Sequence, residues 1–300
     1  MRIDLFWNNL SQSIVRGSSY GAFLLPLLFA ACANENLDQS QELGPLRILA
    51  LKASTPEVTI GTASTSITPW VSDFTHGGDA GRSWSFSWAT CPDPGIPYGA
   101  EPRCDASTII QQGSGTIAAG TLLAANAYTS PLPAITITIP NATTSFWTNR
   151  NAISQSNGVP LIFQFTLNAG SETTTGFRRI LVTSKVIGLN SNPNLTDITV
   201  DGASIAGGGG SLPLVEKEIL PVLGGGSQES YSLITTNGTI LSKNESLTVS
   251  WFTTAGEFQF DRTDTSTSNT WTPPSSGTPR AILFLRDDRG GVSDPLSIGF

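Results

Sequence analysis

The sequence predicts an all-β protein made of two immunoglobulin-like β-sandwich domains in tandem. Short runs rich in β-branched and aromatic residues alternate with polar residues, and clusters of Gly, Pro, Asn and Asp separate these runs. No segment has the apolar periodicity of a convincing amphipathic helix. Each half also carries a tryptophan on a central predicted strand, Trp88 and Trp251, as immunoglobulin-like cores often do.

Residues 1–31 have the three parts of an export signal: early arginines, an apolar middle and small residues before the cut. The apolar middle is roughly half as long as a membrane-spanning helix. The stretch Leu28-Phe29-Ala30-Ala31-Cys32 resembles the lipobox of bacterial lipoproteins, although Phe29 stands where the lipobox usually has Leu, Val or Ile. An ordinary secretory signal with an incidental cysteine and a signal anchor are the alternatives.

The lipobox resemblance implies that Cys32 carries acyl chains such as palmitate and anchors the mature protein in a membrane. Ala33 follows the cysteine, which by resemblance to envelope lipoproteins favours the outer membrane, on its periplasmic or surface face. The polar residues 32–45 are then expected to be a flexible tether.

The first predicted domain covers residues 46–189. We expect strands at 47–60 (broken at Pro56), 64–71, 83–90, 134–140, 161–167 and 177–188. Trp84, Phe86 and Trp88 alternate along one of these strands, so we expect their shared face to be buried. Residues 105–133 are ambiguous, because 116–127 fits either a short helix or a strand with loops.

The second predicted domain covers residues 190–300 and begins at the turn-rich Asn190-Ser-Asn-Pro-Asn. Asp201-Gly202 and Asn237-Gly238 are hairpin signals, and two glycine runs predict further turns. We expect strands at 196–200, 230–235, 245–252, 256–260, 270–272 and 281–286, and a last short strand near the end.

Cys91 and Cys104 form an even pair once Cys32 is assigned to lipid. In an exported chain such a pair predicts one disulfide. The loop between them is rich in proline, and closing it would contribute about 3 kcal/mol of stability.

The charge and the ligand-type residues exclude several functions. The net charge is −7 and no basic cluster occurs, which argues against nucleic-acid binding. One histidine, His76, and no CxxC leave zinc without ligands. Calcium is a weak possibility at Asp261 and Asp264, or at Asp287 and Asp288 near Asp294; a solvated turn in which Asp287 or Asp288 pairs with Arg289 is favoured instead. Otherwise we expect no cofactor.

Catalytic motifs are absent from the expected mature chain. The one Gly-x-Ser-x-Gly lies at Gly17–Gly21, inside the predicted signal, and His76 sits in a Gly/Asp loop typical of a surface. Paired carboxylates that meet in space are not excluded, but no acidic cluster lined by aromatic residues stands out. Trp147 lies in a loop-like stretch and is a candidate for an exposed, glycan-stacking ring.

The segments LRILALKASTPEVTIG, SWSFSWATCPDPG, LTDITVDG, ESLTVSWFTTAGEF and ILFLRDDRGGVSD occur in this order. They resemble lipid-anchored envelope proteins of predatory and social Gram-negative bacteria, which carry immunoglobulin-like or PKD-like domains. The resemblance covers most of residues 46–300. It implies a fold and a compartment, and it carries no functional residues because its motifs are structural.

We therefore expect a non-enzymatic, lipid-anchored cell-envelope protein that acts in adhesion, surface structure or partner binding through β-sandwich loops or edges. A protein or glycan at the cell surface is the expected partner. The alternatives are a carbohydrate-binding accessory module and a subunit of an outer-membrane assembly.

Overall fold

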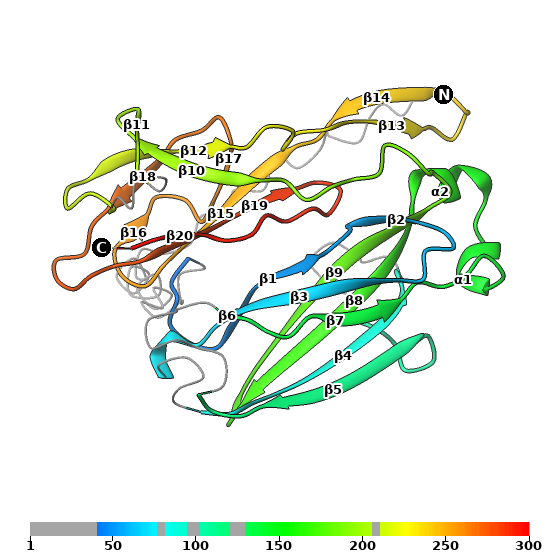
Figure 1. Ribbon diagram of the computed structural model, residues 1–300, viewed down its shortest axis with the longest axis horizontal. Coiled ribbons are helices and arrows are strands. Elements are labelled where there is room, and N and C mark those ends of the chain that lie inside the picture. The colour runs from blue at the N-terminus through cyan, green and yellow to red at the C-terminus, as the bar shows by residue number, and fades with distance from the viewer. Residues whose placement is uncertain (1–40, 77–81, 95–102, 121–129, 206–210, 300) are drawn as a thin grey trace, which may run out of the picture. The chain divides into compact units, whose positions relative to one another are not determined.

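A computed structural model describes residues 41–76, 82–94, 103–120, 130–205 and 211–299 (Figure 1). Residues 40–300 form one compact unit. This unit is built almost entirely of β-strands arranged in sandwich-like pairs of sheets, so the predicted all-β fold class is confirmed. The predicted signal at 1–31 and the predicted lipidation site Cys32 lie outside the described residues.

Two sheets form the first half. One has the strand order β2-β9-β8-β4-β5, and the other has the order β1-β3-β6, with β7 also paired to β3. The pair β2–β9 is parallel and the other pairs of the first half are antiparallel. The strands are β1 (Arg47–Ala53), β2 (Glu57–Thr59), β3 (Ser64–Ser72), β4 (Trp84–Pro92), β5 (Gln111–Ile117), β6 (Ser130–Pro131), β7 (Ile135–Thr138), β8 (Val159–Ala169) and β9 (Glu172–Thr183).

The core of the first half lies between these two sheets. Leu51, Ile67 and Ile137 point into it from one sheet, and Trp84 and Phe163 from the other. Along β3 and β7 these side chains alternate with more exposed ones, which is why the sequence pattern located these strands.

The aromatic stripe of β4 packs against this core as predicted. Trp84 is buried, while Phe86 and Trp88 are partly buried and lie against the core. The neighbouring strand β5 carries glycine opposite both rings: a Cβ atom at Gly113 would lie 2.7 Å from Trp88 Nε1, and one at Gly115 would lie 2.5 Å from Phe86 Cζ. The glycines therefore make room for the rings.

The second half also contains two sheets that enclose a core, together with a separate hairpin. The sheets have the orders β11-β10-β12-β18-β16 and β17-β15-β19-β20, and β13 pairs with β14. Their core centres on three fully buried aromatic rings, Trp251, Phe258 and Trp271. The strands are β10 (Leu195–Val200), β11 (Ala203–Ser204), β12 (Lys217–Leu223), β13 (Ser230–Ile234), β14 (Ile240–Asn244), β15 (Leu247–Thr253), β16 (Glu257–Phe258), β17 (Arg262–Asp264), β18 (Asn269–Thr272), β19 (Ala281–Asp287) and β20 (Leu296–Ile298).

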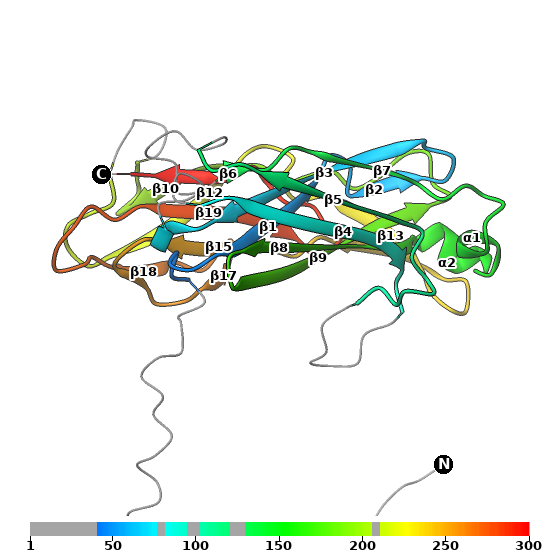
Figure 2. The same cartoon turned by 90° about the horizontal axis from the view of Figure 1, so that it is seen from below.

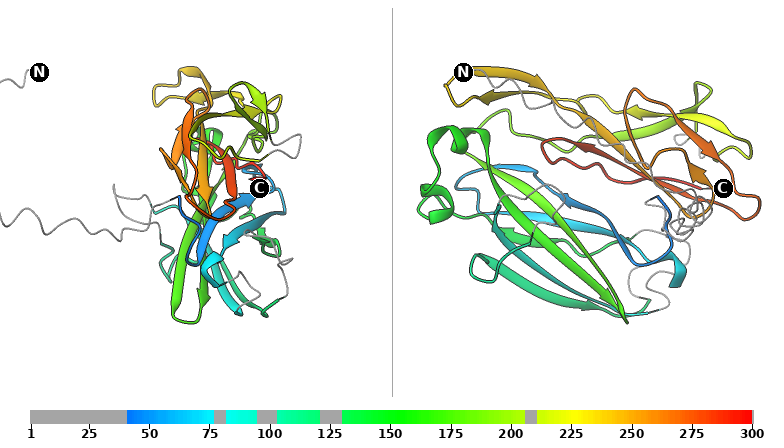
Figure 3. Two further views of the ribbon diagram at one scale, coloured as in Figure 1. Left: turned by 90° about the vertical axis from the view of Figure 1, so that its left-hand side faces the viewer. Right: turned by 180° about the vertical axis from the view of Figure 1, so that it is seen from behind.

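The two halves pack face to face. The outer face of β1 and β3 lies on the outer face of β15 and β19, so the four large sheets form successive layers (Figures 1 and 3). Figure 2 views these layers from the side on which β4, β5, β8 and β9 lie. A third apolar cluster fills the junction and consists of Leu43, Leu49, Ala50, Ile282, Phe284 and Val292, with Trp70, Phe74 and Phe252 against it.

The segment Gln41–Leu43 joins this junction, although the sequence placed it in a flexible tether. Leu43 N–H donates to the carbonyl of Thr253 at 2.7 Å, and Thr253 N–H donates to the carbonyl of Gln41 at 2.9 Å. Leu43 is fully buried. The end of the predicted tether is therefore part of the folded unit, because its apolar side chain fills the junction.

Two short α-helices and a 3-10 helix were not predicted. They are η1 (Phe74–His76), α1 (Ser145–Thr148) and α2 (Ala152–Asn157). The side chain of Asn151 caps α2 by accepting a hydrogen bond from Ser154 N at 2.8 Å. Among the described residues, no helix is long and apolar enough to cross a membrane.

The predicted turns agree with the structure better than the predicted strands do. Asp201 and Gly202 both have positive φ (50° and 80°) and connect β10 to β11 as the hairpin signal predicts. The ambiguous stretch contains β5 at its start, whereas 121–129 lie outside the described residues. In the second half the prediction omitted β11, β12, β14 and β17; β12 contains Pro221, which weakens a strand pattern.

Candidate functional site

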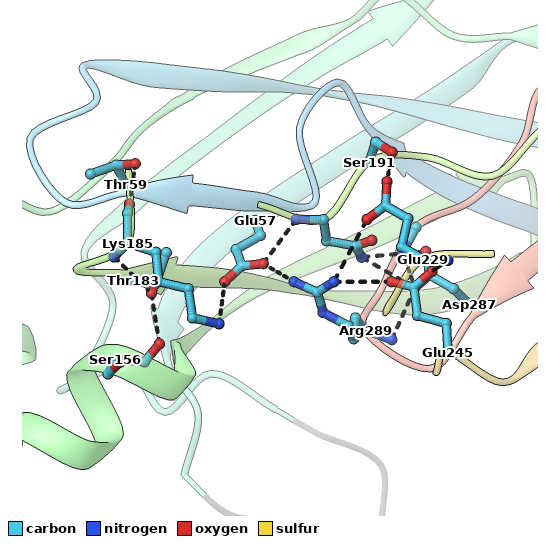
Figure 4. Close-up of polar contacts among 12 residues, drawn as sticks. Glu57, Thr59, Ser156, Thr183, Lys185, Ser191, Glu229, Glu245, Asp287 and Arg289 are labelled. Atoms are coloured by element: carbon cyan, nitrogen blue, oxygen red, sulfur yellow. Dashed lines mark hydrogen bonds and ion pairs between the residues drawn. The ribbon is translucent and has the colours of Figure 1, made fainter. Parts of the chain in front are cut away.

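A buried ion cluster lies beside the apolar junction, centred on Arg289 of the turn that follows β19. The guanidinium of Arg289 pairs with Glu57 on β2 through Nη2, and its Nη1 lies 3.1 Å from Glu245 Oε1 and 3.7 Å from Glu229 Oε2 (Figure 4). Only 7% of the Arg289 side chain and 1% of each of the Glu57 and Glu245 side chains are exposed. The aromatic ring of Tyr231 covers the guanidinium at 4.7 Å.

The segment that connects the two halves forms hydrogen bonds to this cluster and to both halves. Asn190 N–H donates to Glu57 Oε2 at 2.9 Å. Asn192 donates through Nδ2 to the carbonyl of Ala53 at 2.7 Å and accepts from Val292 N at 3.0 Å. The turn-rich stretch that the sequence marked as a domain boundary is therefore held by hydrogen bonds to both halves.

The turn Asp287–Gly291 presents Arg289 to the cluster. Asp287 Oδ1 accepts hydrogen bonds from Arg289 N at 2.9 Å and from Gly291 N at 2.5 Å, and Asn190 Nδ2 lies 3.3 Å from both carboxylate oxygens. Gly290 has a φ of 104°, a conformation that glycine adopts without strain. Burial raises the pKa of Asp287, and its hydrogen bonds oppose that shift.

A cavity of about 380 Å³ lies next to this cluster. One wall is β9, the opposite wall is β13, and the turn after β19 lies between them. Cationic, aromatic and apolar side chains line it together with two aspartates: Phe177, Arg178, Arg179, Leu181, Lys185, Tyr231, Leu233, Asp287, Asp288 and Arg289, with Asn157 and Gly290. A volume of this size is in the range of small-molecule sites.

Arg178 is the cavity residue with unused hydrogen-bonding capacity. Its Nε and Nη2 atoms are buried and have no hydrogen-bond partner. Burial lowers its pKa to about 10, against the attraction of Asp287. The neighbouring Arg286 is also buried, but it donates to the carbonyl of Leu49 at 2.5 Å and to Ser250 Oγ at 3.1 Å. A buried N–H group without an acceptor costs about 1–3 kcal/mol, more when charged, so Arg178 is the group that a ligand would stabilise.

The predicted disulfide between Cys91 and Cys104 is present, with a Cα–Cα distance of 5.6 Å. It starts from the end of β4, and Cys104 N–H donates to Gln164 Oε1 of β8 at 2.8 Å. The disulfide therefore fixes the start and the end of its loop on the sheet, while residues 95–102 lie outside the described residues.

Trp147 does not have the exposure that the sequence suggested. It belongs to α1, is 7% exposed and packs in the core of the first half beside Phe146. The unpredicted helix turns the ring inward, so it offers no surface for stacking a glycan.

Asp287 and Asp288, the weak calcium candidates, lie at the predicted turn, where Asp288 is exposed but Asp287 is partly buried. Asp287 is occupied by backbone N–H donors, and Asp288 is hydrogen-bonded to Tyr231. Arg289, which was expected to pair with one of them, instead pairs with Glu57 and Glu245. The groups that surround Asp287 are N–H donors, whereas a calcium ion requires several oxygen ligands. The other candidate, Asp264, accepts hydrogen bonds from Ser266 and Thr267 as a turn cap.

One further group has the spacing of a metal site. Ligand atoms of Asp73, His76 and Glu172 lie within 4.8 Å of one another. Arg82 occupies the space between the carboxylates, donating to Asp73 at 2.8 and 2.9 Å and to Glu172 at 2.5 Å. Its guanidinium occupies the oxygen atoms of both carboxylates that a metal would need, so we interpret the group as a structural ion-pair network.

Sequence reasoning missed the principal residues of the cavity. Glu57 and Arg289 are 232 positions apart, so no local pattern links them. Arg178 did carry a signal: it precedes the buried Ile180 by two positions and so lies on the inward face of β9. An arginine at an inward position of a strand requires a partner or a function.

No family model matches the chain, and no curated protein matches it. Among solved structures, the chain is similar to the fibronectin(III)-like modules of Clostridium thermocellum CbhA (11% identity, 85% of this chain and 92% of that chain covered, TM-score 0.25). It is also similar to the D0-D1 domain of intimin (10%, 84% and 98%, TM-score 0.20) and to the B domain of a biofilm-associated protein (6%, 87% and 87%, TM-score 0.30). These TM-scores are too low to carry an argument about function, and the fold class rests on the sheets themselves.

Removing the central cation should destabilise the whole unit. We expect Arg289→Met to lower the free energy of unfolding by about 3–5 kcal/mol, because Glu57 and Glu245 would remain buried without their partner. Adding Glu57→Gln and Glu245→Gln to that variant should recover part of the loss. Urea denaturation measures both effects, with the exposed Arg262→Met as the control. Equal stability of Arg289→Met and Arg262→Met would contradict the role of the cluster.

The same cluster should make stability depend on pH. Burial raises the pKa of Glu245 from 4.5 to about 7, so the folded protein binds a proton that the unfolded chain releases at lower pH. The contribution of Glu245 to the free energy of unfolding is then fully present below about pH 4.5 and is lost as the pH rises through about 7.

We expect Glu245→Gln to lose less stability than the wild type between about pH 5 and about pH 7.5, as measured by urea denaturation at each pH. The exposed Glu216→Gln is the matched control. Identical pH profiles for the wild type and Glu245→Gln would show that this carboxyl group does not change its protonation on folding.

Proposed function

We propose that this chain is a non-enzymatic, lipid-anchored binding protein of the cell envelope that holds a surface partner in the cavity beside Arg289. The observation that carries the proposal is the pair of buried Arg178 donors in a cavity framed by both halves. A group that supplies the missing acceptor gains binding energy there, once the Arg178 side chain shifts to present the enclosed donors to the cavity.

The junction supports an adhesive role because it fixes the cavity. The apolar cluster around Phe284 and the ion cluster around Arg289 both contain residues from the two halves and hold them together. A cavity whose walls are held in this way is preorganised, so little conformational entropy is lost when a partner binds. Adhesion to a surface component would benefit from this low entropic cost of binding.

The proposed compartment rests on the N-terminal sequence. Lipid on Cys32 would hold the folded unit at the outer membrane through a short tether, since Gln41–Leu43 already belongs to the fold. The resemblance to lipid-anchored envelope proteins of predatory and social bacteria supports the same location.

A second candidate is a subunit of an outer-membrane assembly. The hairpin β13–β14 favours it, because β14 is exposed along its length and carries Ile240 and Leu241 with 68% and 43% of their surface exposed. A partner strand could add to such an edge.

The anchor is tested by intact mass and detergent partitioning of the native protein beside Cys32→Ser. We expect the wild type to begin at an acylated Cys32 and to enter the detergent phase, and the variant to lose both properties. A native protein with an unmodified thiol at Cys32 would rule the anchor out.

The cavity is tested by applying the purified full chain, fluorescently labelled, to glycan and peptide arrays. We expect Leu233→Trp, which places a larger side chain in the cavity, to weaken the binding that the wild type shows by about tenfold or more. Ile240→Trp is the matched control, because Ile240 lies opposite Ile234 on the exposed strand and its side chain is on the other face of the hairpin from Leu233.

Equal binding by the wild type and Leu233→Trp, or no binding by the wild type, would reject the cavity as the site. Loss of binding in Ile240→Trp alone would instead support the second candidate, in which β14 meets the partner.

A further inference from the structure

We propose that the cavity binds the carboxylate of an acidic sugar, a uronate, through Arg178. This inference rests on the proposed function and names the ligand class of the same site.

Two of the four cations that line the cavity are already held by carboxylates. Arg179 donates to Asp93 at 2.7 Å, and Arg289 is enclosed by Glu57 and Glu245. Lys185 lies 3.7 Å from Glu57 Oε1, a distance too long for a hydrogen bond. Arg178 and Lys185 are therefore the two cations of the lining for which no carboxylate is found at hydrogen-bond distance.

The two aspartates of the lining are already engaged in hydrogen bonds. Asp287 accepts from Arg289 N and Gly291 N, and Asp288 accepts from Tyr231. Neither forms a hydrogen bond with Arg178, but Asp287 attracts its guanidinium, so an entering carboxylate binds Arg178 in competition with that charge.

The free donors of Arg178 favour a planar, bidentate acceptor. The unpaired atoms are Nε and Nη2, which form one edge of the guanidinium group and direct two N–H bonds in parallel. A carboxylate matches this edge with its two oxygens, and such paired bonds are stronger than neutral hydrogen bonds. A single hydroxyl or carbonyl oxygen would satisfy only one of the two donors.

The walls favour a sugar over a peptide strand. At the end of β13 the backbone is not available to an added strand, because Asn157 binds the N–H and the carbonyl of Ile234 at 2.8 and 2.7 Å. The cavity is a compact space of about 380 Å³ between the side chains of Tyr231 and Phe177, and 41% of Phe177 is exposed. A ring with one carboxylate fits these features better than an extended chain.

The test is isothermal titration calorimetry of the purified full chain with trigalacturonate and with its fully methyl-esterified form, which keeps the sugar rings but removes the charge. We expect the ester to bind at least about tenfold more weakly than the acid. A short acidic peptide with a free C-terminal carboxylate is the third probe. We expect it to bind more weakly than trigalacturonate.

Two substitutions and a control assign the binding to Arg178. We expect Arg178→Met to lose trigalacturonate binding and Arg178→Lys to weaken it by about tenfold, because lysine keeps the charge but lacks the two parallel donors. Arg150→Met, an exposed arginine outside the cavity lining, should bind like the wild type. Far-ultraviolet circular dichroism and urea denaturation confirm that each variant is folded.

Equal affinity for acid and ester, or full binding by Arg178→Met, would overturn the inference. Tighter binding of the peptide would replace the sugar by a peptide carboxylate and would also overturn it. A neutral oligosaccharide that binds independently of Arg178 would point to the uncharged hollow on the outer face of β4, β5 and β8, lined by Ser87, Gln112, Ser114, Gln164 and Thr166.

Failure of this inference is distinguishable from failure of the proposed function. If another array ligand binds the wild type and is lost in Leu233→Trp, the cavity remains the binding site and only the uronate class is wrong. If Leu233→Trp changes no binding at all, the proposed function fails together with the inference.

Discussion

The packing of the two halves depends on one guanidinium group buried between carboxylates from distant parts of the chain. Arg289 comes from the turn after β19, Glu57 from β2, and Glu245 precedes β15. Removing charges from water costs several kcal/mol per ion, so this cluster is not a source of large net stability. Its effect is on specificity, because a placement of the halves that separates Glu57 from Arg289 would break the one pair of this cluster that joins them. We interpret it as the feature that selects the register of the junction.

The apolar part of the junction supplies the attraction that the ion cluster cannot. Strand β19 is buried on both faces, because Leu283 and Leu285 point into the core of the second half and Ile282 and Phe284 point toward the first half. The apolar cluster and the ion cluster lie side by side, and the cavity opens where β9, β13 and the turn after β19 meet. The cavity therefore exists because the halves are packed, and each of its walls belongs to an element that the junction positions.

The sequence predicted the strands that alternate and the turns that carry glycine, asparagine or aspartate. It could not predict how the halves meet, since Glu57 and Arg289 lie far apart and a charged residue in a local pattern usually indicates a solvated surface. Two signals were nevertheless present. The uninterrupted apolar run Ala281–Leu285 indicates a strand buried on both faces, and the glycines opposite Phe86 and Trp88 indicate rings packed across a strand pair. Trp147 was misplaced because the short helix that buries it has no periodic pattern.

Arg178 is the residue that gives the fold a functional interpretation. A protein that needed only to hold its halves together could place an apolar side chain at this inward position of β9, since Ile180 and Val182 occupy the next two. A buried guanidinium edge without an acceptor is costly, and natural proteins keep such groups where a ligand or a reaction uses them. The neighbouring Arg286 shows the contrasting case, because it faces the same junction and both of its contacts are satisfied by the protein. The difference between these two arginines is the physical basis for placing the binding site at the cavity and not elsewhere in the junction.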